Sequence, residues 1–205
     1  MLPNSSINNI SHCCNDKLRR QTMAKAIVIG DGPGGLSAAL FLAKKGVEVV
    51  IFGKNETAMH YAMLYNYLGI PAMTGTEFQE VARKQVQEVG ATLHDQQVAQ
   101  ISQTNGGFTV TTEDSASHEG TYLIIAEGKA AKLANTLGVD KTDAGITVDT
   151  HARTNIPGLY VVGRSTKPNR SQAIISAGEG ASAALDILSI EEGQDVCDYD
   201  MVEKK

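Results

Sequence analysis

The chain has 205 residues, of which 42% are hydrophobic, and this length suits one domain, or one large domain with tails. Lys and Arg number 18 against 23 Asp and Glu, for a formal net charge of -5. This acidic balance excludes nucleic acid as an expected partner, because binding to phosphates needs a basic face.

The first 22 residues are polar, rich in Asn and Ser, and lack the apolar core of a signal peptide. We expect residues 1–22 to be a disordered leader, 23–190 to form a single domain, and 191–205 to be an acidic, frayed tail. No apolar run approaches the roughly 20 residues of a membrane span, so we expect no membrane partner. Cys13, Cys14 and Cys197 do not resemble a disulfide framework, which predicts a cytoplasmic protein.

Residues 25–52 have the pattern of a β-turn-α-β unit. Residues 26–29 form a continuous apolar run before glycines, as in a strand that is buried on both faces. Residues 33–45 have helical composition, Gly46 ends that helix, and residues 47–52 predict a second strand.

The elements after residue 53 are shorter. Residues 54–75 predict a loop rich in Met and Tyr, which either covers a ligand or packs as irregular core. Thr76 followed by Gln79 predicts the N-cap of a helix that runs to about residue 89. Asn105-Gly106 indicates a hairpin. The remaining predicted elements are short strands over 91–93, 97–103, 108–112, 121–126, 146–148 and 159–162, and a closing helix over 172–188.

Residues 30–35 read G-x-G-x-x-G between the first strand and the first helix, which is the context of a dinucleotide fingerprint. Gly30 would permit the tight turn, Gly32 would let the backbone approach a pyrophosphate, and Gly35 would let helix and strand pack closely. The helix N-terminus would then offer free N–H groups to the phosphates. The predicted phosphate-binding residues are Gly30, Gly32, Pro33, Gly34 and Gly35.

Two details depart from this fingerprint. An acidic residue usually ends the second strand and binds the adenosine ribose, but here the strand is followed by Gly53 and Lys54, and only Glu56 in the loop offers a carboxylate. Asp31 within the turn is unfavourable near a phosphate unless its side chain points to solvent.

Several separated segments resemble one family. Residues 154–163, Thr then Pro-Gly then an apolar strand ending in Gly, resemble a second flavin-binding motif, and residues 170–180 resemble its thioredoxin reductase version. Gly53 after the second strand, residues 66–69 and residues 124–128 also resemble that family. The resemblance covers about residues 24–190, in the same order. It is to the FAD-binding domain of thioredoxin reductase-like proteins, in the pyridine nucleotide-disulfide oxidoreductase superfamily.

The resemblance implies an α/β fold: a three-layer, Rossmann-like FAD/NAD(P)-binding domain with a parallel central sheet, flanking helices and a small antiparallel β-layer. It also implies FAD as the cofactor and a homodimer as the assembly. A helix N-terminus beside the flavin would stabilise negative charge on the reduced ring. Beyond the glycine loop, the implied cofactor-binding residues are Gly53, Lys54, Asn66, Gly128, Gly163, Arg164, Gln172 and Ala173.

The chain departs from the family in three respects. Only about twenty residues join the strands at 124–126 and 146–148, where the family inserts its NADPH-binding domain. The Cys-x-x-Cys of that insert is absent. Arg164 stands where the family has an Asp, and either pairs with a phosphate or turns to solvent.

We therefore expect a small FAD-dependent oxidoreductase that takes electrons from an external donor, either NAD(P)H or a redox partner protein. Two alternatives stay open: a non-catalytic FAD- or nucleotide-binding sensor or partner subunit, and an NAD(P)-binding Rossmann module. The sequence identifies no catalytic side chain and no metal-ligand spacing. Cys13 and Cys14 are either incidental thiols or a mobile redox dithiol.

Overall fold

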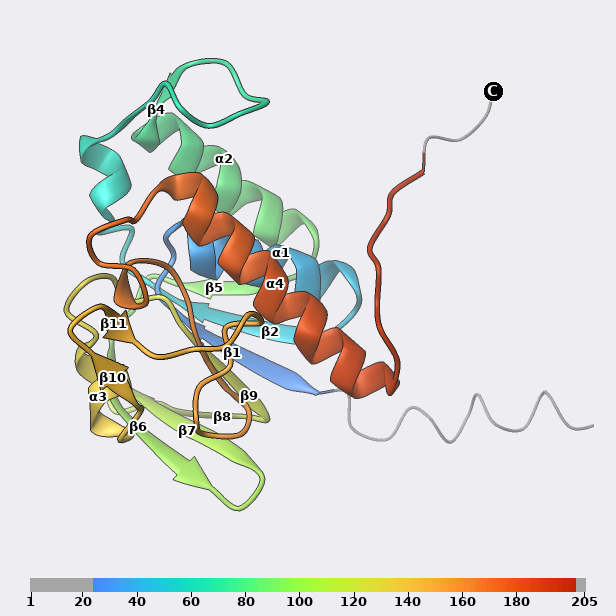
Figure 1. The fold of residues 1–205 in the computed structure, drawn as a ribbon. Helices are drawn as coiled ribbons and strands as arrows, with labels where there is room; N and C mark the ends of the chain where they lie inside the picture. The colour runs from blue at the N-terminus through green and yellow to red at the C-terminus, as the bar shows by residue number, and fades with distance from the viewer. Residues whose placement is uncertain (1–23, 202–205) are drawn as a thin grey trace, which may run out of the picture.

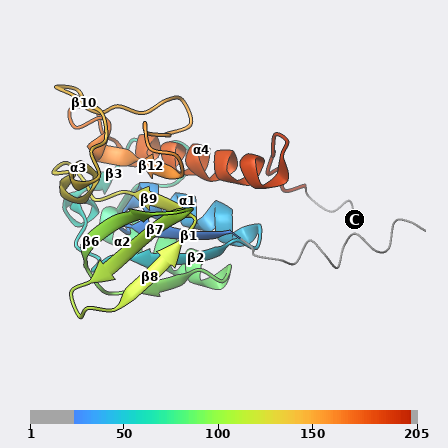
Figure 2. The ribbon, with the colours of Figure 1, turned by 90° about the horizontal axis from the view of Figure 1, so that it is seen from below.

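A computed structural model describes residues 24–201, which form three layers (Figure 1). The middle layer is a five-stranded parallel sheet in the order β12-β9-β1-β2-β5. Helices α1, α2 and α4 cover one face, and a three-stranded antiparallel sheet, β6-β7-β8, lies against the other (Figure 2). The predicted Rossmann-like architecture, with its small antiparallel layer, is confirmed.

The central sheet consists of β1 (Lys25–Ile29), β2 (Glu48–Phe52), β5 (Thr92–His94), β9 (Tyr122–Ile125) and β12 (Leu159–Val161). The antiparallel sheet consists of β6 (Val98–Thr104), β7 (Gly107–Thr112) and β8 (Ser117–Gly120). Two small pairs are β3 (Met63–Leu64) with β4 (Met73–Thr74), and β10 (Lys141–Thr142) with β11 (Gly145–Ile146). The helices are α1 (Pro33–Lys44), α2 (Gly75–Glu88), α3 (Lys132–Thr136) and α4 (Ala173–Glu192), with 3-10 turns η1 (Ala58–Tyr61) and η2 (Gly163–Ser165).

Strand β1 is buried on both faces because its side chains alternate between two cores. Ala26 and Val28 face the helices, where they pack with Leu36 and Leu42 of α1. The intervening Ile27 and Ile29 belong to the second core, between the central sheet and the antiparallel sheet. This burial explains why the strand reads as a continuous apolar run rather than an alternating one.

The antiparallel sheet begins with the predicted hairpin, since β6 and β7 pair around Asn105-Gly106. Its third strand, β8, is an element that the sequence analysis missed. His118 of β8 packs edge-on against Phe52 of β2, with ring centroids 4.8 Å apart, and so joins the antiparallel sheet to the central one.

The second helix begins two residues earlier than expected, and the N-cap is Thr74 rather than Thr76. The Thr74 hydroxyl accepts a hydrogen bond from the Glu77 N–H at 3.2 Å, while the Glu77 carboxylate accepts one from the Thr74 N–H at 2.8 Å. This reciprocal capping box satisfies two backbone donors at the start of α2.

Helix α4 has the length and apolar composition of a membrane span, which the sequence analysis had not counted. Core helices of soluble proteins meet the same criteria, and in this fold the α4 residues Ala183, Ala184 and Ile187 are fully buried. Helix α4 lies alongside α1 (Figure 1), and its second half contributes Ala183, Ala184, Ile187 and Leu188 to the core between the helices and the central sheet.

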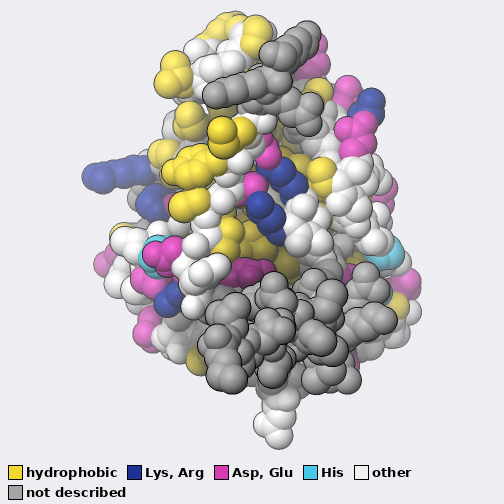
Figure 3. All heavy atoms as spheres, turned by 90° about the vertical axis from the view of Figure 1, so that its right-hand side faces the viewer, with side chains coloured by type: hydrophobic (Ala, Val, Ile, Leu, Met, Phe, Trp, Pro, Cys, Tyr) yellow, Lys and Arg dark blue, Asp and Glu magenta, His cyan; other side chains and the backbone are white. Residues whose placement is uncertain are grey.

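The segment after α4 contacts the domain rather than projecting freely from it. The carboxylate of Asp198 accepts hydrogen bonds from Lys44 at 2.9 Å and Lys45 at 2.8 Å, and the Val196 N–H donates to the Ser189 hydroxyl at 2.9 Å. Figure 3 shows this side of the molecule, where basic and acidic side chains lie next to one another between hydrophobic ones. Cys197 is exposed and has a free thiol, whereas Cys13 and Cys14 lie outside the described residues.

Candidate functional site: two uncapped helix N-termini

The glycine loop between β1 and α1 forms the tight turn that the sequence predicts. Gly30 has a φ of +100°, which side chains other than glycine rarely adopt. A Cβ added to Gly35 would overlap the carbonyl oxygen of Gly30, so helix and strand approach closely only because residue 35 is glycine. The Gly30 N–H donates to the Phe52 carbonyl at 2.8 Å, which fixes the loop to the end of β2.

The N-terminus of α1 has no side-chain cap. Its N-cap residue, Gly32, is extended, and Pro33 occupies the first helical position. The nearest atom to a Cβ added to Gly32 would be the Thr57 hydroxyl at 3.5 Å, so the backbone is open on this side. The first-turn N–H groups of Gly34 and Gly35 receive no side-chain acceptor, and this arrangement suits a pyrophosphate.

The N-terminus of α4 is uncapped in the same way. Its N-cap residue, Gln172, is extended and accepts no hydrogen bond through its side chain from the first turn, which begins at Ala173. The N-termini of α2 and α3 are capped by side chains. Helix α2 begins with its capping box. At the start of α3, the Glu127 carboxylate accepts hydrogen bonds from the N–H groups of Leu133 at 2.9 Å and Ala134 at 2.8 Å. Among the helices that the structure describes, α2 and α3 are therefore capped by side chains, whereas α1 and α4, whose N-termini the resemblance assigns to FAD, are not.

The two bare helices are packed directly against each other. A Cβ on Gly34 would lie 3.1 Å from the Ser176 carbonyl oxygen and 3.0 Å from a methyl group of Val162. Gly34 is in the first turn of α1 and Ser176 is in the first turn of α4, so the two N-termini share one edge of the central sheet. One extended ligand can therefore reach both.

Two predicted flavin-proximal residues meet although they are far apart in sequence. The Asn66 side-chain amide donates to the Gln172 side-chain oxygen at 3.0 Å. This hydrogen bond joins the loop between β3 and β4 to the N-terminus of α4. In the wider segment 54–75, Met59 of η1 and Leu64 of β3 are buried, while Tyr61 and Tyr65 are 95% and 79% exposed, so this segment supplies both core residues and exposed aromatic side chains.

Gly163 lies at the carboxyl end of the last strand and has a φ of +79°. Its N–H donates to the Glu179 carboxylate of α4 at 2.6 Å, and Glu179 also binds Lys167. Arg164 is exposed and makes no hydrogen bond or ion pair with any described residue, so its guanidinium is directed to solvent in this structure. Glu179 is a residue of this region that the sequence analysis did not single out, since its partner Gly163 is 16 residues away.

The remaining predicted residues lie around the ends of β2 and β9. The carbonyl oxygen of Gly128, after β9, accepts a hydrogen bond from the Ser165 hydroxyl at 2.6 Å, so Gly128 and η2 are adjacent. Lys54, after β2, pairs with Glu113 at 2.8 Å, and this contact raises the pKa of Lys54 above its ordinary value. The Lys54 ammonium thus contacts the turn between β7 and β8.

The sequence analysis expected an acidic side chain in this loop to point to solvent. Asp31 is instead buried. Its carboxylate accepts a hydrogen bond from the Asn55 N–H at 3.0 Å and another from the Arg83 guanidinium. The Gln79 side-chain amide of α2 donates to the Asp31 carbonyl oxygen. The negative charge is therefore turned away from the glycine loop toward the end of β2. Its partners in α2 lie about fifty residues along the chain, and no local pattern reveals them.

Comparison with known proteins places these features in a family. The pyridine nucleotide-disulphide oxidoreductase family matches residues 24–139 and 67–180. A ferredoxin–NADP reductase of Lactococcus lactis is 26% identical over 125 residues, which are 57% of this chain and 39% of the relative. NADPH-dependent thioredoxin reductase 3 of Arabidopsis thaliana is 29% identical over 102 residues, which are 46% of this chain and 19% of the relative.

A solved thioredoxin reductase from Gloeobacter violaceus has the same fold, with a TM-score of 0.75 at 19% identity over 89% of this chain and 100% of that chain. The chain spans less than half the length of the curated relatives named above. The family match nevertheless extends over most of residues 24–180, and it includes the glycine loop, the central sheet and the first turns of α4. The chain belongs to the pyridine nucleotide-disulphide oxidoreductase family.

Proposed function

We propose that this chain binds FAD in a single domain and acts as an FAD-dependent oxidoreductase that receives electrons from an external donor. The observation that carries the proposal is the pair of uncapped N-termini of α1 and α4, which meet at one edge of the sheet. Backbone N–H groups at a helix N-terminus stabilise negative charge, and FAD brings a pyrophosphate and a flavin that becomes negative on reduction.

Each part of FAD has candidate partners among the described residues. The pyrophosphate would lie on the amides of the glycine loop at the start of α1. The flavin would lie at the start of α4, beside the Asn66–Gln172 hydrogen bond and Gly163. When bound, FAD supplies the electron transfer itself, and the protein supplies position and electrostatic stabilisation.

An external donor follows from the short connection between β9 and β11. Residues 126–144 contain only α3 and β10, which are too few for a second nucleotide-binding domain at this place. The sequence also contains no Cys-x-x-Cys. We therefore propose that NAD(P)H or a reduced partner protein delivers two electrons directly to the flavin, and that a separate acceptor removes them.

A homodimer is part of the same proposal. Tyr61, Tyr65 and Leu68 lie close together in sequence and are 95%, 79% and 89% exposed. Exposed apolar groups of this kind are typical of protein interfaces. Gel filtration of the wild type against a variant with Tyr61 and Leu68 changed to Ser should show a loss of dimer in the variant. Unchanged elution of the variant would remove this loop from the interface.

The visible spectrum of the purified full chain tests FAD binding. We expect flavin absorbance bands, either as isolated or after incubation with FAD and desalting. A protein that stays colourless after both treatments would contradict the proposal. Anaerobic mixing of the yellow protein with NADPH, NADH or a reduced ferredoxin then tests the donor, because reduction bleaches the flavin. If none of these three donors bleaches a bound flavin, either the electron donor is another molecule or the flavin is bound without being turned over, as in a flavin-binding sensor or subunit.

A further inference from the structure

The end of β2 lacks the acidic side chain that usually binds the adenosine ribose in a dinucleotide site, since Gly53 occupies that position. In this structure the Asp31 side chain, from the glycine loop, occupies the space that a side chain at position 53 would occupy. A Cβ added to Gly53 would lie 2.5 Å from Oδ1 and 2.7 Å from Cβ of Asp31. The carboxyl group of Asp31 thus stands where the side chain of an acidic residue 53 would begin.

We infer that Asp31 is the residue that binds the adenosine ribose, and that it selects a free 2′-hydroxyl over a 2′-phosphate. The inference deepens the proposed FAD site and rests on it. Asp31 has a carboxylate oxygen, Oδ1, that is available to accept a hydrogen bond from the ribose. Both of its side-chain hydrogen bonds, from Asn55 and from Arg83, end on Oδ2, and Oδ1 has no hydrogen-bond partner among the described residues.

The Asp31 carboxylate is held in place by its surroundings. Its side chain is only 6% exposed, and Asn55 adopts a left-handed φ of +56° in the turn where its N–H donates to Oδ2. Gln79 and Arg83, one turn apart on α2, bind the Asp31 carbonyl and carboxylate respectively. A buried carboxylate with one oxygen free is prepared to accept a hydrogen bond from a ligand hydroxyl.

The charges around Asp31 oppose a 2′-phosphate. Arg83 is the cation at this position, and its guanidinium already pairs with two carboxylates, those of Asp31 and Asp95. Lys54, which follows Gly53 in the sequence, is paired with Glu113. Both of these cations are already paired, so neither is spare for a 2′-phosphate that meets the free oxygen of Asp31, whereas sites that accept this phosphate provide an arginine for it.

Glu56, which the sequence also offers for the ribose, is exposed in the loop after β2. Its charge is felt by the neighbouring Lys54. A solvated carboxylate on a loop offers less fixed geometry than one held by a backbone N–H and a guanidinium, which favours Asp31.

The test measures affinities of the full chain for three ligands by flavin fluorescence: FAD, FAD with a 2′-deoxyadenosine, and FAD with a 2′-phosphate on its adenosine. We expect the wild type to bind the deoxy analogue about tenfold to a hundredfold more weakly than FAD, because a hydrogen bond to a charged group is lost. The 2′-phosphate analogue should also bind more weakly. In Asp31→Asn, the affinities for the deoxy analogue and for the 2′-phosphate analogue should each lie within about threefold of the affinity for FAD.

Asp95→Asn is the matched control, because it changes the other carboxylate on Arg83, and it should keep the wild-type ratio between FAD and the deoxy analogue. A second pair of variants tests the same inference if Asp31→Asn fails to fold. Asp31→Gly alone should lose the discrimination, and Asp31→Gly combined with Gly53→Glu should recover it. Asp31 is not the ribose-binding residue if Asp31→Asn keeps the wild-type ratio, or if the wild type binds FAD and the deoxy analogue equally. A wild type that binds no FAD at all overturns the proposed function instead.

Discussion

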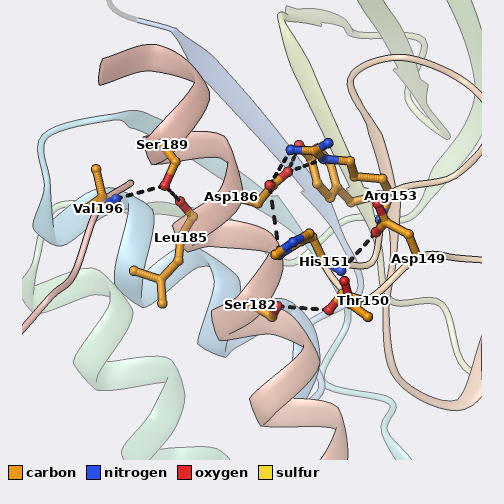
Figure 4. A network of polar contacts seen from close by, with 10 residues as sticks. Asp149, Thr150, His151, Arg153, Ser182, Leu185, Asp186, Ser189 and Val196 are labelled. Carbon is orange, nitrogen blue, oxygen red and sulfur yellow. Dashed lines mark hydrogen bonds and ion pairs between the residues drawn. The ribbon is translucent and has the colours of Figure 1, made fainter. Parts of the chain in front are cut away.

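Arg153 and Asp186 form a two-point ion pair between the segment before β12 and helix α4. The Arg153 Nε donates to Asp186 Oδ2 at 2.6 Å and its Nη2 to Oδ1 at 2.5 Å (Figure 4). The Tyr160 hydroxyl donates to the same carboxylate at 2.7 Å. Burial by itself would raise the pKa of Asp186, but the hydrogen bonds from Arg153 and Tyr160 hold that pKa below its ordinary value.

The first prediction is that Arg153→Ala destabilises the domain. Asp186 is 5% exposed and Arg153 is 46% exposed, so the variant leaves a buried carboxylate with Tyr160 as its main partner. We expect a loss of about 2 to 3 kcal/mol in the free energy of unfolding, less than for a fully buried pair. Urea unfolding measures it. Lys25→Ala, which removes the exposed pair with Glu48, should cost under about 1 kcal/mol, and equal losses in both variants would contradict the prediction.

The second prediction concerns His118 and pH. Burial, together with the nearby His94 and Lys25, lowers the pKa of His118 below its ordinary value. The unfolded chain therefore binds the proton more readily, and the stability that neutral His118 contributes is complete above a pH of about 6.5 and is lost as the pH falls below that value.

His118→Gln cannot be protonated in this range, so its stability should change less between about pH 7 and pH 5 than that of the wild type. Thermal unfolding at a series of pH values measures this dependence. The comparison uses the slopes of the two profiles, because the loss of packing against Phe52 shifts the variant equally at every pH. Parallel profiles would show that His118 does not titrate differently in the folded protein.

The third prediction separates the fold from ligand binding in the glycine loop. Gly32 is extended with a negative φ, and the nearest atom to an added Cβ is 3.5 Å away. Gly32→Ala should therefore fold with a free energy of unfolding within about 1 kcal/mol of the wild type. Its Cβ would stand between the backbone and a pyrophosphate, so we expect FAD affinity to fall at least about tenfold.

Gly178→Ala in the body of α4 is the control, since a Cβ there also meets no atom within 4 Å. It should retain wild-type FAD affinity. Titration of flavin fluorescence measures both variants. If Gly32→Ala binds FAD as tightly as Gly178→Ala, the pyrophosphate does not lie against this loop.

The fourth prediction is that capping α4 trades ligand affinity for stability. Gln172 has the extended backbone of an N-cap residue but provides no cap. In Gln172→Asp the new carboxylate can accept hydrogen bonds from the first-turn N–H groups, which should stabilise the protein without FAD by about 0.5 to 1 kcal/mol. The same carboxylate would oppose a flavin at this helix end, so FAD affinity should fall.

Gln172→Ala controls for the hydrogen bond with Asn66, which both variants lose. The relevant quantity is the difference between the Asp and Ala variants, measured by thermal unfolding and FAD titration. A more stable Asp variant that binds FAD as well as the Ala variant would exclude the start of α4 from the flavin site.

The sequence predicted the elements whose signals are local. The apolar run of β1, the glycines of the loop and the Asn105-Gly106 turn each determine their own structure through neighbouring residues. The N-cap of α2 was placed two residues late because Thr74 with Glu77 and Thr76 with Gln79 are equivalent patterns. In the structure Thr74 is also the last residue of β4, where it pairs with Met63 of β3, a contact that the local sequence pattern does not reveal.

Other features could not be read from the sequence because their cause lies far along the chain. Strand β8 is polar and exists through its pairing with β7. The five-residue helix α3 depends on Glu127, which caps it from the end of β9. The orientation of Asp31 depends on Gln79 and Arg83, whose positions are set by the packing of α2.

The most direct test of the site as a whole is amide hydrogen exchange of the full chain with and without saturating FAD. We predict slower exchange at the first-turn amides of both uncapped helices, Gly34 and Gly35 in α1 and Ala173 and Ile174 in α4, because FAD would accept their hydrogen bonds. The capped start of α2 should not change. Protection confined to one helix, or no protection at either, would contradict a single FAD bound between the two N-termini.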